Sequence, residues 1–187
     1  MFNTLRCIML NNRAEKSGWQ KILEFIGDLD GKVIGDIGAG GGFFTCKFSE
    51  AVGKQGTVYA IDTDKHKLNF IESTIKKENM TNVQTMYCSE KEIPLNQNSV
   101  DVFFSRNSFH HIQSPLEYFS GLRNILKEHG RLVIIDYKKT DTFNFINLFG
   151  HCSSERDILS ALEKSGYQHQ KSLAISENQT CNLFLKK

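Results

Sequence analysis

The residues of this sequence that could do chemistry begin with one acidic residue and three alternating glycines. Asp36 ends an apolar run, and Gly38, Gly40 and Gly42 follow it in the pattern D-x-G-x-G-x-G. Glycine permits a positive φ and lets a ligand approach the bare backbone. The helix expected behind this turn presents N–H groups at its N-terminus, which favour an electronegative ligand. The pattern therefore predicts a strand, a tight loop and a helix that together bind a nucleotide-like molecule.

The spacing of these glycines narrows the choice of ligand. A dinucleotide fingerprint, G-x-G-x-x-G, that began at Gly38 would require a glycine at position 43, where this sequence has Phe43. This difference argues against a nicotinamide-dependent oxidoreductase, which we keep as an alternative.

Apolar spacing predicts the elements that must position this loop. We expect helices over 14–26, 44–52, 64–78, 114–130 and 154–165, and strands over 32–37, 57–61, 82–87, 100–104, 131–135, 168–175 and 181–186. Strands that alternate with helices in this way predict an α/β fold with a doubly wound, Rossmann-like, mostly parallel sheet of seven strands and helices on both faces. In such sheets, ligands bind beyond the carboxyl ends of the strands, beside the first strand.

The order of these features resembles the class I S-adenosylmethionine-dependent methyltransferases, and in particular the small-molecule methyltransferases of the ubiquinone and menaquinone biosynthesis type. The resemblance rests on the glycine loop, on Asp62 at the end of the second strand, and on the stretch Arg106–Ile112 after the fourth strand. It implies S-adenosylmethionine as the cofactor and a small molecule as the methyl acceptor. The cofactor-binding residues that it implies are Asp36, Gly38, Ala39, Gly40, Gly42, Asp62, Thr63, Ser89, Glu90, Arg106 and Asn107.

Two of these residues carry a specific expectation. The resemblance assigns Asp62 to the ribose hydroxyls, and a carboxylate can accept hydrogen bonds from both hydroxyls of a diol. Asp62 also precedes a helix, so a role as helix N-cap is the alternative. At the adenine end, the family usually has an Asp where this sequence has Ser89 followed by Glu90, so the residue that accepts from adenine stays open between these two.

The candidate catalytic residues follow the fourth and fifth strands. His110 and His111 could accept a proton at neutral pH, or they could only support the loop. Asp136 and Tyr137 end the fifth strand on the expected substrate side, although Asp136 could equally cap the next segment. Methyl transfer from a sulfonium mainly requires alignment and exclusion of water, so we expect no metal.

Length and composition bound the remaining possibilities. With 187 residues, a net charge of +2 and no C-x-x-C pair among five cysteines, we expect one cytoplasmic methyltransferase domain without a membrane span or a clear nucleic-acid surface. Residues 1–30 should form an N-terminal helical segment, and the aromatic stretch 138–153 is a candidate substrate cover with Phe143, Phe145 and Phe149. A non-catalytic module that binds S-adenosylmethionine and serves a partner is a further alternative. The sequence does not indicate the acceptor or the oligomeric state.

Overall fold

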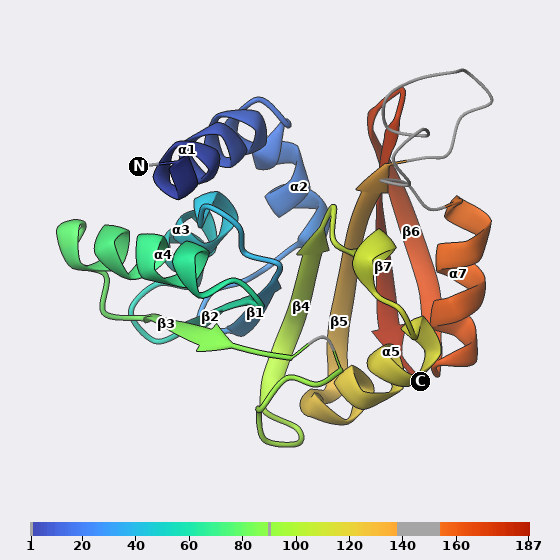
Figure 1. Ribbon diagram of the computed structural model, residues 1–187. Helices are drawn as coiled ribbons and strands as arrows, with labels where there is room; N and C mark the ends of the chain where they lie inside the picture. The colour runs from blue at the N-terminus through green and yellow to red at the C-terminus, as the bar shows by residue number, and fades with distance from the viewer. Residues whose placement is uncertain (1, 90, 138–153) are drawn as a thin grey trace. The chain divides into compact units, whose positions relative to one another are not determined.

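The computed structural model describes residues 2–89, 91–137 and 154–187. These residues belong to two compact units, Met1–Ser89 and Glu90–Lys187, each with its own helices and strands (Figure 1).

The first unit contains four helices and three strands among its described residues. They are α1 (Phe2–Glu15), α2 (Trp19–Ile26), β1 (Val33–Ile37), α3 (Phe43–Val52), β2 (Thr57–Asp62), α4 (Lys65–Lys77) and β3 (Val83–Tyr87). The strands are parallel and lie in the order β3-β2-β1. Ile37 of β1 is opposite Ile61 of β2, and Asp62 is opposite Tyr87 of β3. The carboxyl ends of all three strands therefore lie at one edge, where the glycine loop begins.

The second unit contains the remaining strands and three helical elements among its described residues. They are β4 (Val100–Arg106), η1 (Phe109–His111), α5 (Pro115–Ile125), β5 (Leu126–Tyr137), α7 (Glu155–Lys164), β6 (Tyr167–Ser176) and β7 (Gln179–Lys186). β4 and β5 are parallel, whereas β7 runs antiparallel to both β5 and β6, in the order β4-β5-β7-β6. The seven strands are those of a mostly parallel seven-stranded sheet, as the sequence predicts.

Buried apolar side chains account for the stability of both units. Ile34 of β1, Phe48 of α3 and Ile61 of β2 are fully buried or nearly so in the first unit. Tyr167 at the start of β6 is fully buried in the second unit, and its hydroxyl donates to the carbonyl of Phe119 on α5 at 3.0 Å. Burial of large side chains supplies most of the favourable free energy of folding, so both units are built on ordinary apolar cores.

Three sequence predictions need correction. The single helix over 14–26 is two helices, because Gly18 has a φ of 67° at the N-cap of α2 and separates it from α1. The helix predicted to run to Gly130 ends at Ile125, and its successor Leu126 already has extended backbone. The sequence Ser114-Pro115-Leu116-Glu117 predicts an N-cap Ser with a Glu that completes a capping box; Ser114 is the N-cap of α5, but its side chain makes no cap hydrogen bond.

Candidate cofactor and catalytic sites

The conformation of the glycine loop explains its alternating glycines. Gly38, Gly40 and Gly42 have φ angles of 70°, 61° and 83°. Residues with a Cβ adopt this left-handed region only at a cost, whereas glycine adopts it freely. The backbone between β1 and α3 therefore requires glycine at each of these three positions.

Backbone hydrogen bonds fix the loop to the end of β2. The N–H groups of Gly38 and Ala39 both donate to the carbonyl of Ile61, at 2.8 and 3.0 Å. The N–H of Gly42 donates to the carbonyl of Ala39 at 2.9 Å, and the N–H of Gly40 donates to the Asp62 carboxylate at 3.0 Å. These four donors thus define the shape of the loop itself.

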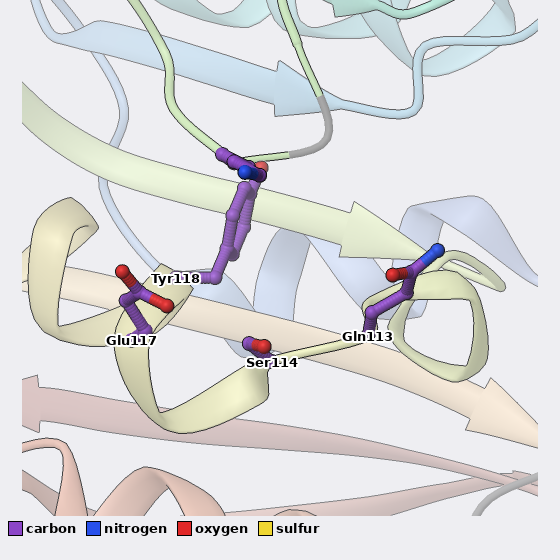
Figure 2. Close-up of a pocket in the computed structure, with 5 residues that line it drawn as sticks. Gln113, Ser114, Glu117 and Tyr118 are labelled. Carbon is purple, nitrogen blue, oxygen red and sulfur yellow. The ribbon is translucent and has the colours of Figure 1, made fainter.

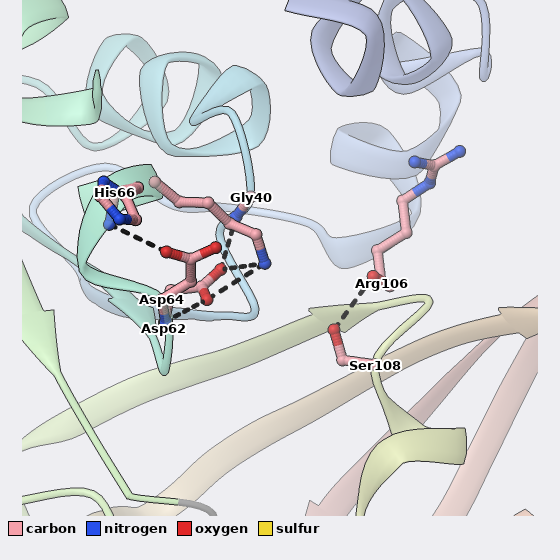
Figure 3. Close-up of polar contacts among 7 residues, drawn as sticks. Gly40, Asp62, Asp64, His66, Arg106 and Ser108 are labelled. Carbon is pink, nitrogen blue, oxygen red and sulfur yellow. Dashed lines mark hydrogen bonds and ion pairs between the residues drawn. The ribbon is translucent and has the colours of Figure 1, made fainter. Parts of the chain in front are cut away.

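Asp62 lies at the centre of a set of hydrogen bonds, drawn in Figure 3. It is 3% exposed, and besides Gly40 N–H it accepts from the N–H of Asp64 at 2.9 Å and from the ammonium of Lys67 at 3.2 and 3.3 Å. The N-cap of α4 is Asp64, whose carboxylate accepts from the N–H of His66 at 2.9 Å. Asp62 is therefore not the N-cap of this helix.

Asp36, the first residue of the motif, is a buried carboxyl. Its carboxylate accepts from the hydroxyl of Thr45 on α3 at 2.6 Å. Burial raises the pKa of Asp36 to about 7, and the neighbouring charge of Asp62 adds to this effect, whereas the bond from Thr45 opposes it. A carboxyl held in this way gains free energy when a cationic group is placed beside it.

Helix α1 lies across the glycine loop. The side chain of Asn11 donates to the carbonyl of Gly41 at 2.9 Å. A Cβ on Gly41 would lie 2.2 Å from the side-chain oxygen of Asn11 and 2.5 Å from the carbonyl of Cys7. Gly41 is therefore required by close packing rather than by a positive φ. Apolar spacing does not mark this helix in the sequence, because Phe2, Leu5, Ile8 and Met9 are exposed on it.

The remaining cofactor candidates of the first unit are more accessible. Thr63 and Ser89 are exposed. Ser89 follows Cys88, whose N–H donates to the carbonyl of Asp62 at 3.3 Å, so Ser89 comes just after the contact that joins β3 to the Asp62 strand end. Burial raises the pKa of the Cys88 thiol to about 11, which keeps it protonated at neutral pH. Glu90 lies outside the described residues.

In the second unit, the structure brings together His110 and Asp136. The Nδ1 atom of His110 lies 3.0 and 3.1 Å from the two carboxylate oxygens of Asp136, and both side chains are buried. The N–H groups of His110 and Tyr137 also donate to this carboxylate, at 3.2 and 2.8 Å. A carboxylate only accepts, so the proton of neutral His110 belongs on Nδ1 and the lone pair on Nε2. The ring of His111 lies 4.1 Å from that of His110, centroid to centroid.

The loop after β4 is held by Gln179, a residue that no sequence motif had indicated. Asn107 has a φ of 55°, which asparagine tolerates better than most residues, and its side-chain oxygen accepts from Gln179 of β7 at 2.7 Å. Arg106 ends β4, and its carbonyl accepts from the hydroxyl of Ser108 at 3.3 Å (Figure 3). The antiparallel pairing of β5 with β7 is what brings Gln179 to this loop.

A row of buried polar side chains continues from Asp136. Thr180 is directly opposite Asp136, and Asn182 and Ser105 are both opposite Ile134. Because Ile134 and Asp136 are two residues apart on β5, the four polar side chains share one face of the sheet. All of them are at most 6% exposed. In the sequence, the signal is that β7 begins with mostly polar residues. In the structure these residues are buried, as in a core strand.

A small polar pocket lies at the start of α5 (Figure 2). Lys91, Gln113, Ser114, Glu117 and Tyr118 line it, and its volume is about 70 Å³. Sites for cofactor-sized or drug-sized molecules usually measure roughly 300–1,000 Å³. This pocket has room for a few waters and is too small for a nucleoside. The candidate substrate cover over 138–153, with Phe143, Phe145 and Phe149, lies outside the described residues.

Residues 28–182 match the family model of a methyltransferase domain, and the chain belongs to this family. The chain is also similar over almost its whole length to the crystal structure of an S-adenosylmethionine-dependent methyltransferase from Aquifex aeolicus, with a TM-score of 0.89, 26% identity and 98% of each chain covered.

Curated relatives match a shorter part of the chain. A demethylmenaquinone methyltransferase from Lactococcus lactis is 28% identical over 116 residues, which are 62% of this chain and 46% of that protein. A tRNA U34 carboxymethyltransferase from Desulfotalea psychrophila is 27% identical over 122 residues, 65% of this chain and 37% of that protein. The chain thus spans half or less of the length of these two relatives.

These comparisons confirm the predicted class. The chain is a class I, Rossmann-like methyltransferase domain, and S-adenosylmethionine is the cofactor of that class. Among the described residues, we find no helix that is long and apolar enough to cross a membrane.

Proposed function

We propose that this chain transfers the methyl group of S-adenosylmethionine to a small-molecule acceptor. The observation that carries the proposal is the hydrogen bond from the Gly40 N–H to the buried carboxylate of Asp62, which joins the glycine loop to the end of β2. The arrangement places a bare backbone turn beside an acceptor suited to a diol. Similarity to a demethylmenaquinone methyltransferase supports a small molecule as the acceptor.

In this proposal the residues of the first unit hold the cofactor. Asp62 accepts from the ribose hydroxyls, and Asp36 stabilises the α-ammonium group, because a buried carboxylate gains most from a cation. Gly38, Ala39, Gly40 and Gly42 let the methionine part approach the backbone. Thr63 and Ser89 border the adenosine part, together with Glu90. When bound, the cofactor supplies an electrophilic methyl group on a good leaving group.

The residues of the second unit would handle the acceptor. We propose that Nε2 of His110 accepts the proton that the methyl acceptor loses. Asp136, 3.0 Å from Nδ1, keeps the proton of neutral His110 on Nδ1 and stabilises the imidazolium that forms. His111 would support the ring of His110 through their tilted ring contact, 4.1 Å from centroid to centroid. Tyr137 is assigned to the acceptor, and Arg106 and Asn107 are assigned to the cofactor. We propose the cytoplasm as the location, since Cys7, Cys46, Cys88 and Cys181 are free thiols.

Calorimetry with S-adenosylmethionine and S-adenosylhomocysteine tests the cofactor assignment. We expect micromolar binding by the wild type and a loss of at least about 100-fold in affinity in Asp62→Ala, because a buried acceptor for two hydroxyls is removed. Asp64→Ala is the matched control, since it removes a neighbouring carboxylate that only caps α4. Equal affinity in wild type and Asp62→Ala would refute the assignment.

Turnover separates the enzyme from the non-catalytic alternative. The purified protein is incubated with S-adenosylmethionine and a panel of phenols, quinols, alcohols and amines, and release of S-adenosylhomocysteine is measured. An enzyme releases product with at least one of these acceptors and loses most of that rate in His110→Ala. Tight cofactor binding without turnover would favour a binding module, and tighter binding of NADH than of S-adenosylmethionine would favour an oxidoreductase.

A further inference from the structure

The ammonium group of Lys67 is bound to Asp62, the carboxylate that the proposed function assigns to the ribose hydroxyls. Its Nζ atom lies 3.2 Å from Oδ1 and 3.3 Å from Oδ2 of Asp62. The side chain of Lys67 is 24% exposed and that of Asp62 is 3% exposed, so the ion pair is largely shielded from water. Lys67 belongs to the first turn of α4, which starts three residues after Asp62.

The hydrogen-bonding capacity of Asp62 is filled in this arrangement. Oδ1 accepts from the N–H of Asp64 and from Lys67, while Oδ2 accepts from the N–H of Gly40 and from Lys67. A carboxylate offers about four lone-pair sites in its plane. Two ribose hydroxyls therefore need at least one of these donors to leave.

The three donors differ in how freely they can leave. The N–H of Gly40 belongs to a loop held by hydrogen bonds from Gly38 and Ala39 to Ile61. The N–H of Asp64 is fixed by the start of α4, where Asp64 is the N-cap. Lys67, in contrast, reaches Asp62 through a flexible four-carbon stem and is partly exposed to water.

We propose that Lys67 competes with the ribose of the cofactor for Asp62, and so sets the affinity and the release rate of the cofactor and its product. This inference rests on the proposed role of Asp62. Binding exchanges the Lys67 ion pair for two hydroxyl hydrogen bonds, and dissociation re-forms the ion pair. S-Adenosylmethionine and S-adenosylhomocysteine carry the same ribose, so the competition weakens both equally and leaves their ratio unchanged. It therefore limits retention of the product without discriminating against the substrate.

A different role for Lys67 makes the opposite prediction. If the ammonium stayed in place and donated to a ribose oxygen, it would hold the cofactor, and its removal would weaken binding. A purely structural role in α4 would leave the affinity unchanged. The sign of the change in affinity thus distinguishes the three roles.

The test is calorimetry of the full chain with S-adenosylhomocysteine and S-adenosylmethionine. Lys67→Met keeps the stem of the side chain and removes its charge, and we expect it to tighten both ligands about fivefold, as for the loss of a partly shielded ion pair. Lys76→Met removes the same charge from an exposed position on the same helix and should change neither affinity. Lys67→Arg, which can pair with a carboxylate through two N–H groups, should bind both ligands no more tightly than the wild type.

The same Lys67→Met substitution in an Asp62→Asn variant tests whether the tighter binding depends on Asp62. In Asp62→Asn, where the ion pair is absent, the added Lys67→Met substitution should no longer tighten S-adenosylhomocysteine. Weaker or unchanged binding in Lys67→Met overturns the inference, as does a tightening that persists in Asp62→Asn or that affects one ligand alone. If the wild type binds neither ligand, the proposed function itself fails, which is a distinguishable result.

Discussion

The hydroxyl of Thr45 donates to the carboxylate of Asp36 at 2.6 Å, and both side chains are at most 3% exposed. This contact joins Asp36 of β1 to Thr45, the third residue of α3, across the glycine loop. Burial raises the pKa of Asp36 to about 7, so the protein without cofactor holds a carboxyl that is half-protonated near neutral pH. Asp36 is therefore placed to respond both to pH and to a bound cation.

Replacing Asp36 should stabilise the cofactor-free protein at high pH. Folding raises the pKa of this carboxyl from 3.8 to about 7, so the native state holds a proton that the unfolded state has lost. The wild type then loses stability as the pH rises through this window, whereas Asp36→Asn has no such loss. We expect the stability advantage of Asp36→Asn to grow by about 2 kcal/mol between pH 5 and pH 8. Urea unfolding at several pH values measures it, and a constant difference would contradict the prediction.

Binding of S-adenosylmethionine should depend on the same proton. A cationic α-ammonium group favours ionised Asp36, so affinity should fall by up to tenfold per pH unit below about pH 7, where the ligand's amino group stays protonated. Thr45→Val removes a hydrogen bond that lowers the pKa of Asp36 and should move the midpoint upward. Ser49→Ala on the same helix, whose hydroxyl bonds Asn82 instead, should leave it in place. Calorimetry from pH 5 to pH 9 gives both midpoints, and a pH-independent affinity would refute the role of Asp36.

A methyl group on Gly41 should disturb the contact between α1 and the glycine loop. Its Cβ would lie 2.2 Å from Asn11 Oδ1 and 2.5 Å from the Cys7 carbonyl, which is backbone and cannot rotate away. We expect Gly41→Ala to lower the free energy of unfolding by about 1–3 kcal/mol. Gly121→Ala in α5 meets nothing within 4 Å and should be neutral or slightly stabilising. Equal stability of the two variants in urea would show that α1 does not hold this position.

Loss of the Asp136 carboxylate should cost far more than loss of an exposed one. Asp136→Ala leaves two partly buried N–H groups and the Nδ1 proton of His110 without their acceptor, at a cost of about 2–4 kcal/mol. Glu50→Ala removes only the exposed partner of Lys47 and should change the free energy of unfolding by less than about 0.5 kcal/mol. Nitrogen NMR of His110 should show the Nδ1-protonated tautomer in the wild type. A dominant Nε2-protonated form would contradict our assignment of the base.

Local sequence signals were sufficient for much of the first site. The strand before Asp36 and the helix after Gly42 follow from apolar spacing, and the three positive φ angles follow from glycine chemistry. The sequence did not decide whether Asp62 accepts from the ribose or caps a helix, because a residue in either role stands just before a helix. The structure assigns the cap to Asp64 by its hydrogen bond to the N–H of His66.

Other features depend on contacts that no local pattern encodes. Within the N-terminal segment expected to be helical, apolar spacing did not mark helix α1, because its buried residues are only Cys7 and Ala14 and its exposed apolar residues obscure the helical period. Ser114 had the sequence of a capping box, yet its side chain makes no cap bond in the structure. Tertiary packing overrides such local preferences whenever its free energy is larger.

The sequence by itself determined the class of fold, the glycine loop and the residues at the strand ends, because these depend on chain periodicity and on the backbone freedom of glycine. Only the tertiary structure decided which of those residues meet. Strand register and helix position set four such pairs: Lys67 with Asp62, Thr45 with Asp36, His110 with Asp136 and Gln179 with Asn107. A pair of this kind exists because two backbones come to lie side by side, and the separation of its members along the chain carries no trace of that proximity.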